Sequence, residues 1–397
     1  MSTRRPANQE LSAAKLQRER ERREKNYDDT IVAIKFLAIA AFLIWFGFVG
    51  CANGEASASA TRKIPAADSS RLGTRPVGKI RDEVLPYRRA ARSASALSVL
   101  PAGASVGQYA AGGMTITVAT SPGYVPDASL SQTWANFFAG LPQSGDAGSM
   151  TVYFATQAEM ESYCSSEASA CYDPQHQLMV LTGGATTLDG VPLVEVAAHE
   201  FGHHIALRRD NDPWLAYNWG PKYWASYQGV CPGVINDELF PGDEGDNYGL
   251  NPAEGWAEAY RVAAGGSASF WGVVDDFFKP DGDAIEAALD DARSPWDGNE
   301  YRVLNGRFSS RGARVIRTKL STPLDGRFYV RVRASRGLDV DIYVYDENDR
   351  QLLDRSLKGG RNERLNSIVC GDASQYVYFR RASKRGGKFS ASLVYAG

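Results

Sequence analysis

The chain has 397 residues, 44% of them hydrophobic, and a formal net charge of −2 with a pI of about 6.2. This length and apolar content exclude a wholly disordered protein and are sufficient for two ordinary domains. A charge so close to neutral gives no electrostatic reason to expect nucleic acid as a partner.

An apolar run covers residues 31–51 and follows a polar, charge-mixed tail at residues 1–30. A transmembrane helix needs about 20 such residues, so the run is long enough to span a membrane. Basic residues before the run outnumber those close behind it, which predicts a cytoplasmic amino terminus. We expect a single-pass cell-membrane anchor with the remaining chain extracytoplasmic. Two alternatives stay open: a signal peptide cleaved to give a secreted protein, and a lipoprotein attached at Cys51.

Cysteine usage also favours an oxidising compartment. Apart from Cys51, the four cysteines all follow the apolar run, and an even number there is typical of disulfide pairs. We predict a bridge between Cys164 and Cys171 across a short loop. This leaves Cys231 and Cys370 to join the two folded domains.

Composition and periodicity divide the chain after the apolar run into a linker and an α+β domain, before a further region described below. Residues 52–101 are rich in Ser, Ala, Arg and Pro without apolar periodicity, which predicts a flexible linker. Strand and helix patterns alternate over residues 102–298 and predict an α+β layer. Strands are expected at 114–118, 150–155 and 178–182, and helices at 130–138, 157–164, 192–207, 252–264, 269–278 and 283–292.

Residues 299–397 have a different pattern. Short segments alternate between apolar and polar residues and are separated by turn residues, which predicts an all-β sandwich or jelly roll. The clearest strands are expected at 327–333, 339–345, 375–379 and 388–395.

The strongest chemical signal is the motif His199-Glu200-Phe201-Gly202-His203. On a helix this spacing puts both imidazoles on one face, where they can bind a single metal ion. Glu200 is then placed to act as the general base for metal-activated water in amide hydrolysis. His204 points elsewhere on the helix and is expected to be structural.

A third ligand is expected downstream. Ala206 and Arg209 stand where a metzincin extension requires glycine and histidine, so that class is excluded. Glu254 and Glu258 lie one helical turn apart within the helix expected at 252–264. One of them can ligate the metal while the other orients a ligand.

These two segments together resemble the gluzincins, the thermolysin-like clan of zinc metallopeptidases. The resemblance implies a zincin-like fold and one catalytic Zn²⁺ held by His199, His203 and Glu254, with Glu258 as a second-shell residue fixing a histidine tautomer. Glu258 departs from the aspartate usual in that family. The family's second helix also often starts Asn-Glu, whereas Asn251 here is separated from the glutamate.

The carboxy-terminal segment resembles bacterial pre-peptidase C-terminal domains, which are small β-sandwiches attached to secreted proteases. The resemblance rests on Leu338-Asp-Val-Asp-Ile-Tyr-Val-Tyr-Asp346 and the closing Gly-Lys-Phe-Ser-Ala-Ser-Leu-Val. It implies an accessory module without catalytic residues.

Three further features are candidates for roles at the site. Tyr248 is the candidate catalytic donor to a tetrahedral oxyanion, and its rivals are Tyr217, Tyr223, Tyr260 and His176. The strand at 178–182 is either an edge that pairs with an extended substrate or a buried core strand. The acidic stretch 243–247 offers oxygen ligands for Ca²⁺ but lacks a defined loop motif, and a solvated loop is the alternative.

The sequence therefore predicts a membrane-anchored, extracytoplasmic zinc metalloendopeptidase with a peptide or protein substrate. Zinc amidase action on cell-wall peptides is an alternative within the same chemistry. A different class of function is a non-catalytic surface scaffold that retains a zinc site, with the β-sandwich as its binding part.

Overall fold

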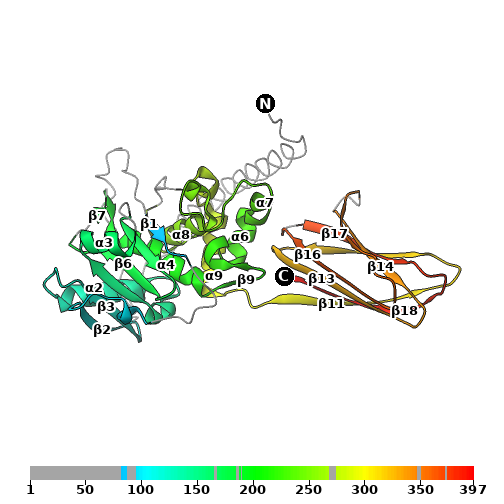
Figure 1. Cartoon of the computed structure of the whole chain (residues 1–397), viewed down its shortest axis with the longest axis horizontal. Coiled ribbons are helices and arrows are strands. Elements are labelled where there is room, and N and C mark those ends of the chain that lie inside the picture. Colours follow the sequence, from blue (N-terminus) through cyan, green and yellow to red (C-terminus); the bar gives the residue numbers. More distant parts are fainter. Residues whose placement is uncertain are drawn as a thin grey trace, which may run out of the picture. The chain divides into compact units, whose positions relative to one another are not determined.

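The computed structural model describes residues 82–86, 95–164, 168–184, 187–188, 190–267, 274–346, 350–371 and 373–397 (Figure 1). All of these belong to one compact unit, Val77–Gly397. The predicted tail and apolar run at 1–51 lie outside the described residues. Within the described part of the chain, no helix combines the length and the apolar character needed to cross a membrane.

The amino-terminal part of this unit is mixed α/β, built on a six-stranded sheet with the order β1-β5-β6-β4-β3-β2. Strands β6, β4 and β3 are parallel to one another, β2 is antiparallel to β3, β5 is antiparallel to β6, and β1 is parallel to β5. The strands are β1 (Asp82–Val84), β2 (Ser105–Ala111), β3 (Met114–Thr120), β4 (Thr151–Ala155), β5 (Ala170–Asp173) and β6 (Leu178–Thr182).

The central strands are apolar because both of their faces are covered. All five residues of β4 are buried, as are four of the five in β6. Strand β6 has β4 on one side and β5 on the other, so the expectation that residues 178–182 form a substrate-binding edge is wrong. The alternative, a buried core strand, is confirmed.

Helices α2, α3, α4, α8 and α9 lie at positions that the periodicity predicts, and several of them have side-chain caps at their first turns. Asp127 caps α2 and Thr156 forms a capping box with Glu159 at α3. Pro192 is the N-cap of α4 and lies just before its first turn. The helices are α2 (Ala128–Gly140), α3 (Gln157–Tyr163), α4 (Leu193–Leu207), α5 (Ala216–Trp219), α6 (Lys222–Gln228), α7 (Val230–Ile235), α8 (Pro252–Ala263) and α9 (Gly282–Arg293).

Two segments differ from the sequence prediction. Strand β1 and the 3-10 helix at Ala96–Ser98 both fall in the predicted linker 52–101, so the folded unit begins before residue 102. Of the helix expected at 269–278, the described residues contain only a 3-10 turn at Asp276–Phe278, capped by Asp275. An Asp-Asp pair at the start favours such a capped turn over a longer helix.

Helix α6 receives its amino-terminal cap from a distant helix. Its own N-cap is Pro221, which makes no side-chain cap bond. Both carboxylate oxygens of Asp291 on α9 instead accept hydrogen bonds from the backbone N–H groups of Tyr223 (3.1 Å) and Trp224 (2.7 Å). Burial raises the pKa of Asp291 to about 7, although these two hydrogen bonds oppose the shift.

The carboxy-terminal part is an all-β sandwich of two antiparallel four-stranded sheets, ordered β11-β18-β13-β16 and β12-β17-β14-β15 (Figure 1). Apolar residues alternate inward along each central strand, as in Phe328, Val330 and Val332. The four strands expected from the sequence are confirmed. The strands are β11 (Asn299–Phe308), β12 (Val315–Thr322), β13 (Gly326–Ala334), β14 (Val340–Tyr345), β15 (Leu352–Ser356), β16 (Asn362–Val369), β17 (Ala373–Arg381) and β18 (Gly387–Ala396).

Both predicted disulfides are confirmed. Cys164 pairs with Cys171 and so fastens the end of α3 to β5. Cys231 in α7 pairs with Cys370, which precedes β17. Lys222 adds a second link between the two parts of the chain, because its buried ammonium donates to the carbonyl oxygens of Asp212 and Asp325, each at 2.8 Å.

The cap on α6 predicts a measurable loss of stability. Asp291→Ala leaves two buried N–H groups without their acceptor, and we expect the free energy of unfolding to fall by about 1–3 kcal/mol. Urea unfolding at pH 5 of the full chain tests this. Asp283→Ala, an exposed aspartate at the start of the same helix, is the matched control and is expected to change stability by less than about 0.5 kcal/mol.

The pH dependence of Asp291→Asn tests the raised pKa separately. Between the unfolded value of 3.8 and the folded value of about 7, folded Asp291 keeps a proton that the unfolded chain has lost. Stability of the wild type should therefore fall relative to Asp291→Asn as the pH rises through this interval, and the difference should level off above it. Parallel stability profiles for the two proteins would show that Asp291 titrates normally.

Candidate metal centre

The motif at 199–203 lies in the middle of α4, a helix buried on almost every side. All residues from Val196 to Ala206 are buried, although His199, Glu200, His203 and His204 are ionisable. His199 and His203 are one turn apart and turn the same face toward α8. Because both imidazole rings are buried, neighbouring side chains restrict their movement.

Helix α8 packs closely on α4 at Gly202. A Cβ added at Gly202 would lie 3.0 Å from the Cα of Ala257 and 3.3 Å from the Cβ of Tyr260, so glycine permits an approach that alanine would push apart. The indole N–H of Trp256 donates to the carbonyl oxygen of Gly202 at 2.8 Å and fixes the same contact. The glycine inside the motif therefore sets the distance between the two helices.

The start of α8 is fixed by the loop before it. The Asn251 side chain accepts hydrogen bonds from the N–H groups of Gly242 (2.9 Å) and Ala253 (3.1 Å), and its amide donates to Glu244 at 2.7 Å. Pro252 occupies the first helical position, where its missing N–H costs nothing. These contacts place Glu254 in the first turn of α8, facing α4.

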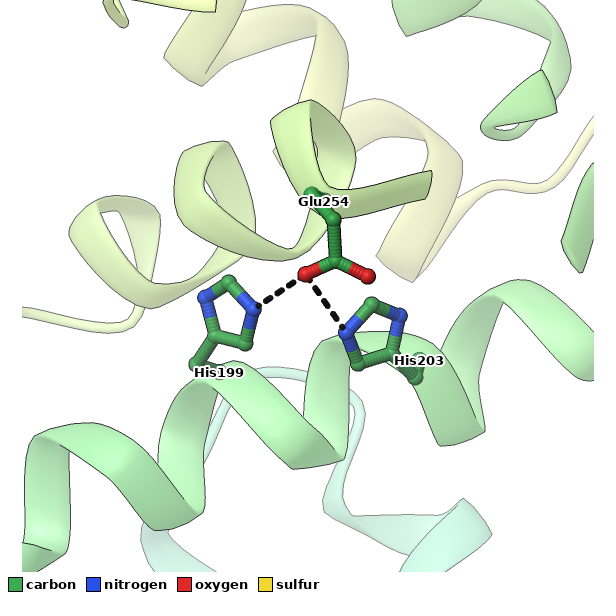
Figure 2. A group of neighbouring side chains, drawn as sticks. All are labelled: His199, His203 and Glu254. Atoms are coloured by element: carbon green, nitrogen blue, oxygen red, sulfur yellow. Dashed lines mark hydrogen bonds and ion pairs between the residues drawn. The ribbon is translucent and has the colours of Figure 1, made fainter. Parts of the chain in front are cut away.

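Figure 2 shows the result: His199 and His203 project from α4 and Glu254 projects from α8 toward both rings. One carboxylate oxygen of Glu254, Oε2, lies 3.2 Å from Nε2 of His199 and 3.5 Å from Nε2 of His203. All three side chains are fully or almost fully buried. Ligand atoms of the three lie within 4.8 Å of one another, so the group can hold a metal ion.

The carboxylate of Glu254 supports that fit. Its second oxygen, Oε1, is buried and accepts no hydrogen bond from the described residues. Such a group costs free energy unless it gains a partner, and a cation is the partner that a carboxylate and two imidazoles share.

Glu258 faces the other ring nitrogen of His199, Nδ1. Its Oε2 lies 3.8 Å from Nδ1 of His199, and the Arg261 guanidinium binds both carboxylate oxygens at 2.8 Å. Burial alone would raise the pKa of Glu258, but Arg261 and His199 outweigh it and lower the pKa to about 2. Arg261 also contacts Glu195 of α4 at 2.5 Å, so one buried cation links the two helices.

Glu200 and Tyr248 lie in the same neighbourhood. Glu200 is fully buried in α4 between the two histidines. The Tyr248 hydroxyl donates to Oε2 of Glu254 at 3.0 Å, which puts it beside the oxygen nearest the histidines. Its role as an oxyanion donor stays a prediction.

Three of the four rival donors have other side-chain partners. Tyr260 donates to the carbonyl oxygen of Pro142 at 2.6 Å, and His176 pairs with Asp173 at 2.5 Å. Tyr217 donates to the carbonyl oxygen of Leu85 at 3.1 Å. For Tyr223 the contact is made by the backbone, whose N–H binds Asp291, so its hydroxyl stays a rival candidate.

His204 points away from the candidate metal group, as the helical spacing predicts. Its Nε2 lies 3.0 Å from the carbonyl oxygen of Asp146 and its Nδ1 lies 2.7 Å from the Tyr172 hydroxyl. A carbonyl can only accept, so Nε2 carries the proton and Nδ1 accepts from Tyr172. Burial lowers the pKa of His204 to about 4, so the ring is neutral at physiological pH.

The acidic stretch 243–247 has a structural use. Asp243 accepts from the N–H of Gly245 and the amide of Asn247, and Glu244 holds Asn251. Among the described residues it is not one of the groups close enough to hold a metal, so Ca²⁺ stays a prediction without a site. A second cluster, Cys231, Asp325 and Cys370, is excluded as a metal site because its sulfur atoms form a disulfide.

No family model matches the sequence, and no curated protein matches it either. Similar solved structures include the pre-peptidase C-terminal domain of collagenase from Bacillus anthracis, with 14% identity, 23% of this chain and 87% of that chain covered, and a TM-score of 0.20. The Yersinia pseudotuberculosis-derived mitogen has 9% identity, with 24% and 86% covered and a TM-score of 0.20. PliG, a periplasmic inhibitor of g-type lysozyme from Aeromonas hydrophila, has 15% identity, with 24% and 85% covered and a TM-score of 0.18. Because these TM-scores are so low, none of the similarities assigns a function to this chain.

Arg261 is predicted to support both the fold and metal affinity. Arg261→Met leaves the buried Glu258 carboxylate without its cation, and we expect the free energy of unfolding to fall by about 3–5 kcal/mol. Arg261→Lys keeps the charge but not the two-point contact, so an intermediate loss is expected. In variants that still fold, metal affinity, measured with Zn²⁺ as the probe against a chromophoric chelator, should fall about 10- to 100-fold.

The matched control is Arg327→Met. Arg327 pairs with Asp212 at 3.2 Å, but both side chains are about half exposed. An exposed pair contributes no more than about 1 kcal/mol, and zinc affinity should stay unchanged. Equal effects at the two arginines would contradict the role given to Arg261.

Proposed function

We propose that this chain is a zinc metallopeptidase of the gluzincin type, anchored to the membrane by residues 31–51 with its catalytic part extracytoplasmic. The observation that carries the proposal is the buried group of His199, His203 and Glu254, with Glu200 between the two histidines. Two imidazoles and one carboxylate are the ligand set of many catalytic zinc sites, in which a fourth position stays open.

The distances between the candidate ligand atoms support zinc as the metal. Tetrahedral ligands at about 2.0–2.1 Å from a zinc ion lie about 3.3 Å from one another. The two imidazole nitrogens lie 3.2 and 3.5 Å from Oε2 of Glu254. An all-oxygen cation such as Ca²⁺ or Mg²⁺ would not select two imidazoles.

The chemistry assigned to the residues follows from their types. When bound, zinc would supply Lewis-acid polarisation of a carbonyl and a water of lowered pKa. Glu200 takes the proton from the attacking water and returns it to the leaving amine. Glu258 lies 3.8 Å from Nδ1 of His199, where its negative charge would favour a proton on Nδ1 and so leave Nε2 free to ligate the metal.

A further group is needed for the oxyanion, and Tyr248 is the candidate we retain. Its hydroxyl already lies beside the carboxylate of Glu254. The residue is half-buried and lies in the short 3-10 turn before α8. A phenol in that position can donate to a substrate oxygen once a substrate displaces its present bond.

Two disulfides within the folded unit support the extracytoplasmic location. Cys164–Cys171 and Cys231–Cys370 are stable in an oxidising compartment and unusual in a reducing one. This agrees with the orientation expected from the basic residues before residue 31.

The test pairs zinc content with hydrolysis of a mixed peptide library by the full chain in detergent. Wild type should bind one zinc ion and cleave peptides. Glu200→Gln should keep the zinc and lose about 100- to 10,000-fold in kcat, because only the base is removed. Glu254→Ala should lose the zinc and therefore the cleavage.

Glu161→Gln, an exposed glutamate on α3, is the matched control and should leave both readouts unchanged. A wild type without zinc would sink the proposal. A wild type that holds zinc, with no cleavage of any library peptide, would favour a non-catalytic scaffold.

A further inference from the structure

The outer face of the sandwich sheet β11-β18-β13-β16 is basic (Figure 1). Successive side chains on a strand point to opposite sides of the sheet, and the alternation of burial along these strands identifies the set that points away from the sandwich core. No aspartate or glutamate belongs to that outward set on these four strands, all of whose residues the structure describes. The set contains six basic residues, Arg307, Arg327, Arg331, Arg333, Arg364 and Lys388. We call this surface the basic face.

The strand register puts like charges next to each other on the basic face. Arg331 on β13 lies directly opposite Arg364 on β16, and Arg307 on β11 lies directly opposite Lys388 on β18. Like charges in such pairs destabilise a sheet. Of the six basic residues only Arg327 forms an ion pair with a described residue, Asp212, at 3.2 Å. The face therefore carries positive charge that the fold itself does not neutralise.

The pair Arg331 and Arg364 is suited to an anionic ligand. Nε of Arg331 is buried and has no hydrogen-bond partner among the described residues. A buried donor without an acceptor costs free energy. Guanidinium groups bind carboxylate and phosphate oxygens through two parallel N–H donors. An anion over this pair would therefore supply a missing acceptor and also reduce the repulsion between the two side chains.

The near-neutral charge of the whole chain hides this surface. Residues 299–397 contain 20 Lys and Arg against 10 Asp and Glu, whereas the whole chain contains 44 against 46. The sandwich is thus strongly basic and the rest of the chain is acidic. Charge asymmetry of this kind indicates that the basic part meets a polyanion.

The neutral side chains of the basic face distinguish between kinds of polyanion. Most of them are hydrogen-bonding groups, and the Tyr301 hydroxyl donates to Oγ of Ser392 at 3.0 Å on this surface. Hydroxyl, amide and phenol groups match the hydroxyl groups of a sugar chain, whereas docking on a bilayer needs a continuous apolar surface. The exposed aliphatic side chains, Val303 and Ile368, are on the two outer strands of the sheet. The hydrogen-bonding residues are Tyr301, Tyr329, Asn362, Asn366, Ser390 and Ser392.

We propose that the basic face binds a linear polysaccharide that carries carboxylate groups, with Arg331, Arg333 and Arg364 as its main contacts. The preference for a polysaccharide over a nucleic acid rests on the extracytoplasmic location proposed above. Four strands and the length from Tyr329 to Arg333 give the face about 14 Å in each direction, enough for a few sugar units. The sandwich would then hold the chain on an acidic polymer outside the cell.

Binding of an acidic oligosaccharide tests the proposal. The probe is fluorescein-labelled decagalacturonate, and its affinity for the full chain in non-ionic detergent is measured by anisotropy at several salt concentrations. We expect Arg331→Gln/Arg333→Gln/Arg364→Gln to lose at least about tenfold in affinity. The dependence of affinity on salt should also become shallower, because fewer counterions are released on binding.

The matched control is Lys319→Gln/Arg355→Gln/Arg380→Gln, which removes the same charge from exposed positions on the other sheet of the sandwich. It should change the affinity by less than about threefold. Maltodecaose, a neutral chain of the same length, should not bind. The single variant Arg364→Gln separates binding from folding: its melting temperature should rise because a like-charge pair is removed, while its affinity for the probe falls.

Three results would overturn the proposal. One is an absence of probe binding by wild type, and another is an equal loss in the two triple variants, which would mean that only net charge matters. The third is a different occupant: tighter binding of single-stranded DNA of equal charge, or capture of phosphatidylglycerol vesicles by the chain in phosphatidylcholine nanodiscs that the oligosaccharide does not inhibit. The peptidase proposal is tested separately, because none of these substitutions touches a candidate metal ligand.

Discussion

The close packing of α8 against α4 is the constraint on which the candidate site depends. Gly202 allows the two helices to approach, and Trp256 fixes the approach with a hydrogen bond to its carbonyl oxygen. Only at this separation does Glu254 reach both imidazoles. The glycine therefore contributes to the ligand geometry although it carries no ligand atom.

That packing also brings three buried carboxyl groups together. Glu200, Glu254 and Glu258 are all fully buried, and the guanidinium of Arg261 is committed to Glu258 and to Glu195. Buried carboxylates are tolerated when cations or donors compensate them. A divalent cation at Glu254 would supply positive charge at the centre of the interface, so metal binding and helix packing should stabilise each other.

The sheet contributes to the same region through β5. Its Tyr172 hydroxyl donates to Nδ1 of His204 on α4, and the disulfide at Cys171 fastens the strand to α3. Strand β5 is therefore tied both to α3 and to α4.

Much of this could be predicted from the sequence because the signals are local. The spacing of His199 and His203, the one-turn separation of Glu254 and Glu258, and the period-2 strands of the sandwich each report neighbours within a few residues. Short elements gave weaker signals. Strand β2 was missed, although Gly112-Gly113 marks its hairpin turn with β3. Helices α5 to α7 are too short for a helical period to show.

By itself the sequence determined which residue types lie on one helical face and where the strands of the sandwich run. Tertiary structure alone decided that β6 is interior, that Asp291 caps a helix some 70 residues away in the chain, and that Arg261 of α8 binds Glu195 of α4. It also decided that residues 82–86 leave the linker to join the sheet. Which strands become neighbours, which side chain caps a distant helix and which charges pair between two helices all depend on which distant segments meet. No local periodicity encodes that choice.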